Sequence, residues 1–328
     1  DRQWSRGLGD VYKRQMYVIK NGLPKRMLPL AYFFALAGMI GCLPAFQSNQ
    51  LIQITGDLAF SEIENFNILG GLVLAGITGI VVIGGLKRIA EVATFLVPLM
   101  GSIYFGAMLV ALILNLNLVL PAFKLIFVDA FNGTAIAGGT FFGVLIYGVR
   151  RGAFSNEAGM GTESLVHGVA KVSNPVKQGL VAMTGPIFDT LIICTATALM
   201  ILVSGVWETS SSQGVTLTAE AFSILLGNFG GLILFVCVIC FGLSTIFTYS
   251  YYGASCSRFL FGKFGMKFYI YLYILSIFIY SIVPIDIAIN IADGAFAMMA
   301  IPTLISALWL APKVMQASKN YFKLIDNN

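Results

Sequence analysis

The chain has 328 residues, of which 58% are hydrophobic and 11% charged, and its formal net charge is +5. Soluble domains carry about 25% charged residues, so this composition excludes an ordinary soluble protein and predicts a membrane protein with several spans. The basic residues form short clusters between apolar runs, which excludes a nucleic-acid surface as the reason for the positive charge.

Residues 1–15 differ in composition from the rest of the chain. They are charged, lack a long apolar run and show neither the n-region nor the h-region of a signal peptide. We therefore interpret residues 1–15 as a non-native leader. Residues 16–328, which begin at Met16, are interpreted as a single, partial transmembrane domain.

Apolar runs predict eight membrane-spanning helices, since a span needs about 20 apolar residues and tilt widens that range. They lie at about 28–47, 66–85, 92–114, 134–149, 179–205, 222–252, 268–284 and 287–311, and the run at 134–149 is short. The lysines and arginines after residue 15, except Lys124, all fall in alternate connections. The positive-inside rule makes those connections cytoplasmic. We therefore expect a multi-pass protein of the inner cell membrane with both ends of the native segment in the cytoplasm.

No catalytic triad, metal cluster or phosphate loop is visible in the sequence. His167 is the only histidine, and the five cysteines lie in or beside apolar runs, where they are expected to pack. Cys237 and Cys240 have the spacing of a redox pair, but they lie inside an apolar helix. We therefore predict no enzyme activity and no catalytic residue.

An amide-rich run follows Pro44 in the first predicted helix. It consists of Gln47, Ser48, Asn49 and Gln50. Four polar residues at one depth are not expected to face lipid. They therefore either hydrogen-bond to neighbouring helices or line a polar site.

The segment 148–162 is unusually polar for a stretch that directly follows an apolar run. It reads Gly148-Val-Arg-Arg-Gly-Ala-Phe-Ser-Asn-Glu-Ala-Gly-Met-Gly-Thr162. Polar, glycine-rich backbone at a membrane helix end must lie in protein, in water or around a solute. The plainer alternative is a cytoplasmic loop whose arginines only anchor the topology. The segment resembles the signature of the sodium:alanine/glycine symporter family, G-[VI]-[KR]-R-G-x-F-S-N-E-A-G-[ML]-G.

The resemblance covers the chain from residue 16 to the C-terminus. It includes Met16-Tyr-Val-Ile-Lys-Asn-Gly-Leu, Gly84-Gly-Leu-Lys-Arg-Ile-Ala, Pro175-Val-Lys-Gln-Gly-Leu-Val, Ser250-Tyr-Tyr-Gly and Asn290-Ile-Ala-Asp-Gly. That family has the all-α leucine-transporter fold of two inverted five-helix repeats. The resemblance implies that helices three to ten are present and the first two missing. Since helix one supplies half of each site in that fold, we expect residues 16–328 alone neither to bind alanine nor to transport it.

Hydroxyl groups are frequent in the apolar segment 241–253. Thr245, Thr248, Tyr249 and Tyr252 share one helical face by their spacing. Hydroxyls that bond back to backbone carbonyls are the structural alternative to a site. The resemblance implies that Ser244 and Thr245, with the carbonyl of Phe241, bind sodium as the coupling ion. Where this chain has Tyr249 the family usually has tryptophan, which leaves the size of the substrate open.

The resemblance also implies a substrate pocket. Its expected lining residues are Gln47, Asn49, Phe142, Gly143, Thr245 and Tyr249. Phe141, Phe142, Gly143 and Gly148 are the positions where we expect a break in the sixth helix of the fold. Helix breaks matter because discontinuous helices present their ends and free carbonyls to ions and substrates.

Charged and amide side chains inside predicted spans are costly in a membrane and must pair or serve function. Asp189 lies in an apolar run, and its expected partners are Arg150, Arg151 or nearby amides. We predict gating or structural roles for these residues and for Asn156, Glu157, Asn290 and Asp293.

The sequence therefore predicts sodium-coupled symport of a small neutral amino acid, alanine or glycine, by alternating access. We expect a monomer in the lipid bilayer with no nucleic-acid partner. A proton-coupled transporter of the same fold would be expected to need a titratable residue at the sodium position, and Ser244 and Thr245 offer none. A channel would need a continuous polar pore, whereas the polar residues cluster on a few helices near mid-depth.

Overall fold

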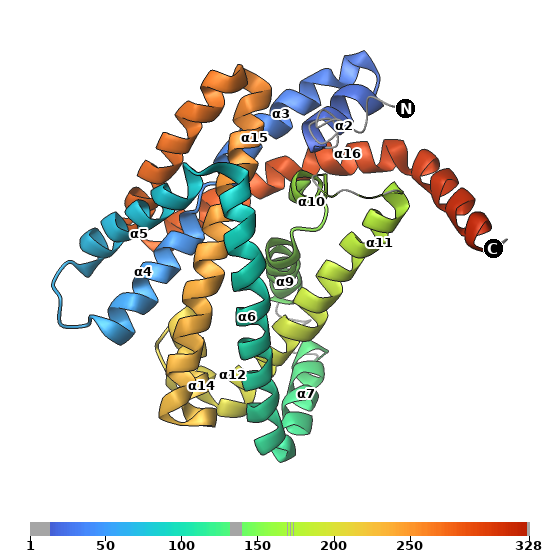
Figure 1. Cartoon of the computed structure of the whole chain (residues 1–328). Coiled ribbons are helices and arrows are strands. Elements are labelled where there is room, and N and C mark those ends of the chain that lie inside the picture. Colours follow the sequence, from blue (N-terminus) through green and yellow to red (C-terminus); the bar gives the residue numbers. More distant parts are fainter. Residues whose placement is uncertain (1–13, 132–139, 169, 171, 173, 327–328) are drawn as a thin grey trace.

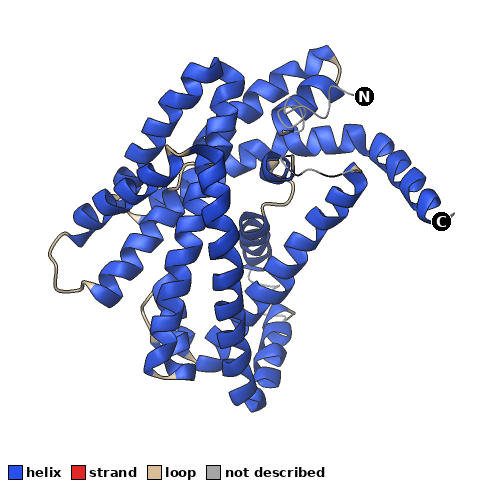
Figure 2. Ribbon diagram, in the orientation of Figure 1, coloured by secondary structure: helices blue, strands red, loops and turns tan. Residues whose placement is uncertain are grey.

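The chain forms helices of very different lengths joined by short connections. A computed structural model describes residues 14–131, 140–168, 170, 172 and 174–326. All regular structure in that part of the chain is helical (Figures 1 and 2). This confirms the predicted all-α class, whereas the inverted-repeat arrangement stays a prediction. Of the expected leader, residues 1–13 lie outside the described residues.

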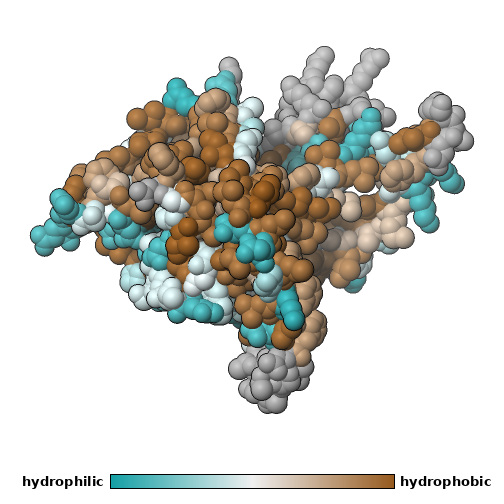
Figure 3. Space-filling model, turned by 90° about the horizontal axis from the view of Figure 1, so that it is seen from below, coloured by the Kyte–Doolittle hydropathy of each residue, from teal (hydrophilic) through white to brown (hydrophobic). Residues whose placement is uncertain are grey.

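Several helices are long and apolar enough to cross a membrane. By length and composition, five segments qualify among the described residues: Lys25–Ala59, Arg88–Leu114, Pro175–Ser204, Phe229–Ile282 and Ile285–Ile325. The fourth segment contains two predicted spans, because the chain bends at Gly262, where φ is +68°. Apolar side chains cover much of the face in Figure 3. The chain is therefore a multi-pass membrane protein.

The longest helix, α15 (Asn228–Ile282), lies at the centre of the packing. It contacts α4 (Ala45–Ala59), α5 (Phe66–Val82) and α6 (Gly85–Leu114). Figure 1 shows these helices around its two halves. The last helix, α16 (Ile285–Asp326), packs on α3 (Leu28–Gly41), and α2 (Gln15–Gly22) and the short helix η2 (Lys25–Met27) adjoin α3. The fully buried side chains here include Phe34, Tyr273, Ile277, Phe296 and Met299.

Two predicted spans are interrupted. The span 28–47 becomes α3 and α4, which meet at Pro44, where the ring removes the N–H that a continuous helix would use. The span 222–252 begins in α14 (Val215–Leu226) and continues in α15. Gly227 separates them with φ +69° and ψ −163°, a conformation that strongly favours glycine.

The middle of the chain differs most from the prediction. Residues 116–130, expected as a connection, form helix α7 (Leu116–Ala130). The span 179–205 is a composite of α11 (Pro175–Pro186), the π-helix η3 (Ile187–Cys194) and α12 (Thr195–Ser204), followed by the short α13 (Val206–Thr209). The first part of the span 134–149, residues 132–139, lies outside the described residues.

The expected helix break at residues 141–148 was wrong. Helix α9 (Thr140–Asn156) runs through Phe142, Gly143 and Gly148 without interruption. The chain leaves the helix at Glu157, where φ is +53°, and Gly159 and Gly161 also have positive φ before α10 (Thr162–His167) begins. Glycine permits a break but does not require one, so glycines inside an apolar helix can stay helical.

Candidate functional site

A cavity of about 810 Å³ opens between the helices around α15. Its walls come from α4, α6, α9, η3, α12, α14 and α15, with Glu157 after α9 and Gly214 ahead of α14. The predicted residues that line it are Gln47, Glu157, Asp189, Phe241, Ser244, Thr245 and Tyr249. This is the largest set of predicted residues that the structure brings together, so we take the cavity as the candidate site.

The hydroxyl face of α15 points into this cavity. Thr245, Thr248, Tyr249 and Tyr252 all line it, which confirms the shared face expected from their spacing. The Ser244 hydroxyl donates to the carbonyl of Phe241 over 3.0 Å, and the Thr248 hydroxyl donates to the carbonyl of Ser244 over 2.8 Å. Back-bonding therefore accounts for these two hydroxyls. The Thr245 hydroxyl has no hydrogen-bond partner among the described residues, so it is available to a ligand.

Tyr249 connects α15 to the chain that follows α9. Its side chain is buried, and its hydroxyl donates to the carboxylate of Glu157. The Tyr249 ring lies 5.7 Å from the ring of Tyr252 and 6.4 Å from that of Phe296. Glu157 directly follows α9, and its φ of +53° shows that its backbone is no longer helical. The two residues place a carboxylate and an aromatic ring side by side in the cavity wall.

The amide run on α4 divides between two sides of the helix. Gln47 and Gln50 line the cavity. The Gln50 side-chain oxygen also accepts from the backbone N–H of Val215 over 3.2 Å. Asn49 lies outside the cavity, where its side-chain nitrogen donates to the carbonyls of Val283 over 2.7 Å and Tyr280 over 3.3 Å. Asn49 therefore hydrogen-bonds to a neighbouring part of the chain, whereas Gln47 lines the polar cavity.

Asp189 lies in the cavity wall, in the π-helix η3. It accepts from the hydroxyl of Ser155 over 2.5 Å and from that of Thr190 over 3.3 Å. The expectation that an arginine or an amide is its partner was wrong. Asn156 is close by, and its side-chain nitrogen donates to the Thr190 hydroxyl over 3.0 Å. Two polar residues of the 148–162 motif thus connect α9 to η3.

Arg151 forms an ion pair with Asp293 on α16. Its guanidinium carbon lies 5.5 Å from the ring centre of Tyr147 and 5.4 Å from that of Phe154. Both charged side chains are partly buried, at 29% and 24% exposure. The pair joins α9 to α16 across 142 residues of sequence.

The remaining predicted residues do not reach the cavity. Phe142 and Gly143 lie on an exposed part of α9, and Phe142 is 69% exposed. Arg150, on the same helix, and Asn290, on α16, are also exposed. The geometry therefore gives no support to a pocket role for Phe142 or Gly143.

Several cavity residues were missed in the sequence, among them two on α6 and one on α12. Met100 and Tyr104 come from α6 and Thr197 from α12. The hydroxyls of Tyr104 and Thr197 lie 2.8 Å apart. A tyrosine and a threonine inside apolar runs are a weak signal by themselves, and only the packing of α6 against α12 brings them together.

The donor set of the cavity suits some cations better than others. Within the described residues there is no group of three or more His, Cys, Asp or Glu side chains that could hold a metal ion. The hydroxyls and carbonyls around Ser244 are hard oxygen donors, which suit a hard cation better than a transition metal.

Comparison with known proteins gives one consistent family. The sequence model of the sodium:alanine symporter family matches residues 9–328, so the match starts before Met16. The chain is 34% identical over 329 residues to the sodium/alanine symporter AgcS of Methanococcus maripaludis, covering 97% of this chain and 71% of that protein. It is 36% identical over 325 residues to the uncharacterized transporter YflA of Bacillus subtilis, covering 96% and 67%. It is also 32% identical over 308 residues to the probable sodium/glutamine symporter GlnT of Bacillus subtilis, covering 93% and 63%.

Proposed function

Because the chain belongs to the sodium:alanine symporter family, we propose that it carries alanine or glycine into the cell together with sodium. The family is one of symporters, so its members are transporters that couple an amino acid to a cation. The observation that carries the finer proposal is the α15 wall of the cavity. The Thr245 hydroxyl, which has no hydrogen-bond partner among the described residues, lies there beside Ser244 and the carbonyl of Phe241.

Sodium is proposed to bind at this wall. Inside a membrane protein a cation must exchange its water for oxygen ligands, and hydroxyls with helix carbonyls supply them. The Thr245 and Ser244 hydroxyls and the Phe241 carbonyl belong to one turn of α15. In this proposal they offer the ion three oxygen ligands from one helix.

The amino acid is proposed to bind between Gln47, Glu157 and Tyr249. The Glu157 carboxylate, held by the Tyr249 hydroxyl, offers the negative charge that an α-ammonium group needs. The Gln47 amide can donate to the α-carboxylate. The cavity also contains Gln50 and has room for a longer side chain than that of alanine. Glutamine is therefore a competitor that must be tested, since one relative bears that substrate in its name.

The topology and oligomeric state are proposed as expected from the sequence. The distribution of basic residues over the connections supports a topology with both ends of residues 16–328 in the cytoplasm. The protein is proposed to act as a monomer.

Sodium-driven uptake tests the function directly. The protein is expressed from its complete gene and reconstituted in proteoliposomes with an inward sodium gradient. We expect saturable uptake of labelled alanine that collapses when the gradient is dissipated. Competition with unlabelled glycine, alanine, serine and glutamine ranks the substrates. Equal uptake with sodium replaced by potassium would contradict the proposal.

A cysteine in the cavity offers a second, independent readout. Cys194 lines the cavity and is exposed, with its sulfur 3.2 Å from the Ser155 hydroxyl, whereas Cys42, Cys237 and Cys256 are buried. We expect alanine plus sodium to slow alkylation of Cys194 by a small thiol reagent several-fold. The Cys194→Ala variant identifies the labelled residue. Unchanged alkylation at saturating alanine would place the substrate elsewhere.

Tyr249 is expected to influence substrate choice. Tyr249→Trp enlarges the ring and removes the hydroxyl bond to Glu157, whereas Tyr249→Phe removes only the hydroxyl. Small changes of pocket volume change kcat/KM ratios by about tenfold or more. We expect Tyr249→Trp to shift the ratio between glycine and serine by about that factor, with the sodium dependence retained. Identical competition profiles in all three proteins would remove Tyr249 from the substrate site.

Proton coupling is the second candidate, and one observation favours it. The sequence offers no titratable group at the sodium position, but the structure places the Glu157 carboxylate in the same cavity. Uptake driven by a pH gradient without sodium, and lost in Glu157→Gln, would support this candidate. Uptake that needs sodium at every pH would exclude it.

A further inference from the structure

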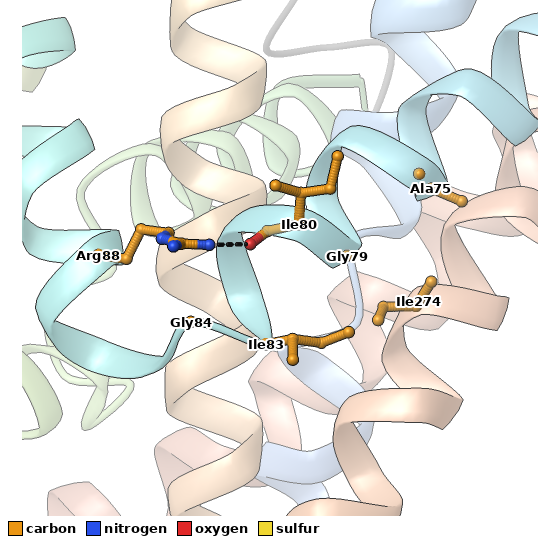
Figure 4. A pocket seen from close by; sticks show the side chains of 8 residues that line it. Ala75, Gly79, Ile80, Ile83, Gly84, Arg88 and Ile274 are labelled. Atoms are coloured by element: carbon orange, nitrogen blue, oxygen red, sulfur yellow. Dashed lines mark hydrogen bonds between the residues drawn. The ribbon is translucent and has the colours of Figure 1, made fainter.

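The motif Gly84-Gly-Leu-Lys-Arg88 has no part in the proposed transport site. It joins the C-terminal end of α5 to α6. Beside it, a second cavity of about 600 Å³ lies between α5 and α15 (Figure 4). The cavity is apolar along its length, and Arg88 is the one charged residue among the described side chains that line it.

Two glycines on α5, which have no side chains, leave the space that forms this groove. No heavy atom lies within 4 Å of where a Cβ on Gly76 would be, and a Cβ on Gly79 would meet only Ile274 at 3.6 Å. Ile80 and Ile83 form the rim and are 69% and 62% exposed. The groove is therefore open to the surroundings of the helices, which in a membrane are lipid chains.

Arg88 folds back across one end of the groove. Its Nη1 donates to the carbonyl of Ile80 over 2.7 Å, as Figure 4 shows. This carbonyl lies in the last turn of α5, where helix carbonyls lack helical partners. A Cβ on Gly84 would approach the Cδ, Nε and Cζ of Arg88 to 2.7–3.0 Å, so glycine is needed for this position of the guanidinium.

The guanidinium keeps most of its binding capacity. Arginine has five N–H donors, of which the Ile80 carbonyl uses one. None of the ion pairs between described residues includes Arg88. A cation held at the end of an apolar groove is therefore available to an anion that also carries an apolar chain.

We propose that this groove binds one anionic phospholipid, with its phosphate at Arg88 and an acyl chain along Gly76 and Gly79. Guanidinium and phosphate form paired, charge-assisted hydrogen bonds. The positive-inside rule places Arg88 at the cytoplasmic surface, where basic pockets between helices bind anionic head groups. The acyl chain fills a groove that the protein leaves open. Free phosphate would gain only the guanidinium, and in a zwitterionic lipid the cation of the head group offsets the phosphate charge and weakens its attraction to Arg88.

Lipid binding by the purified protein tests the proposal. Native mass spectrometry measures occupancy during titration with phosphatidylglycerol or phosphatidylcholine of equal chain length. We expect phosphatidylglycerol to bind about tenfold more tightly, because its head group has no cation that competes with Arg88 for the phosphate. Arg88→Gln should remove this preference, and Arg88→Lys should retain part of it. Arg26→Gln, which removes an exposed charge away from the groove, should change nothing.

A second variant separates the groove from the charge. A Cβ at Gly76 would meet no heavy atom within 4 Å, so Gly76→Leu is expected to extend into the groove and to weaken binding of both lipids at this site while the fold is kept. If Arg88→Gln alters thermal unfolding through the lost bond to Ile80, the lipid affinities of Gly76→Leu alone test the proposal. Equal affinities for the two lipids, or an unchanged preference in Arg88→Gln, would overturn the proposal. Displacement of the lipid by millimolar inorganic phosphate would identify a free-anion site instead.

Discussion

Replacing Ser244 and Thr245 together with alanine is expected to raise the sodium concentration for half-maximal alanine uptake by about tenfold or more. Each hydroxyl that contacts a charged group contributes about 1.5–3 kcal/mol, and about 1.4 kcal/mol corresponds to a factor of ten. The alanine concentration for half-maximal uptake at saturating sodium should change far less. A sodium titration of uptake in proteoliposomes measures both.

The single variants distinguish the two hydroxyls. Ser244 already donates to the Phe241 carbonyl over 3.0 Å, whereas Thr245 has no such partner among the described residues. Thr245→Ala should therefore have the larger effect, and Thr245→Ser, which keeps the oxygen, should stay close to the parent. Thr248→Ala is the matched control, because the Thr248 hydroxyl donates to the Ser244 carbonyl. An unchanged sodium dependence in the double variant would remove both residues from the site.

The face of α15 could be predicted because it depends only on local geometry. Residues three and four apart lie on one side of any α-helix. Once an apolar run fixed this segment as helical, Thr245, Thr248, Tyr249 and Tyr252 had to share that side. The same reasoning assigns polar residues on α4 to the helix surface, but it cannot tell which neighbour each one meets. Gln47 lines the cavity, whereas the Asn49 side chain donates to the carbonyl of Val283 at the end of α15.

The helix break could not be placed from the sequence for a different reason. Gly143 and Gly148 are as permissive as Gly159 and Gly161, and local preference does not rank them. The break lies where the partners are: Glu157 is next to the helix end, and the Tyr249 hydroxyl on α15 donates to its carboxylate. Pairs of residues that are far apart in sequence depend on how whole helices pack, and one sequence contains no record of that packing.

The ion pair of Arg151 and Asp293 is a contact of this kind, and breaking it is expected to cost much stability. Asp293→Ala leaves a guanidinium without its carboxylate between Tyr147 and Phe154. Removing one partner of a buried pair costs about 3 kcal/mol, and partial exposure of this pair lowers that figure. We expect a loss of about 1–3 kcal/mol in the free energy of unfolding, read from denaturant unfolding in detergent.

A double-mutant cycle isolates the pair from its surroundings. Because each single variant strands one charge, Arg151→Ala with Asp293→Ala should be less damaging than the sum of the two single changes. Asp293→Asn keeps the shape and removes the charge, so it should resemble Asp293→Ala if the charge is what matters. The exchange of Arg151→Asp with Asp293→Arg should recover part of the loss. Strictly additive single changes would mean that the contact between α9 and α16 contributes nothing as an ion pair, and that the arginine acts through its stacking on Tyr147 and Phe154 alone.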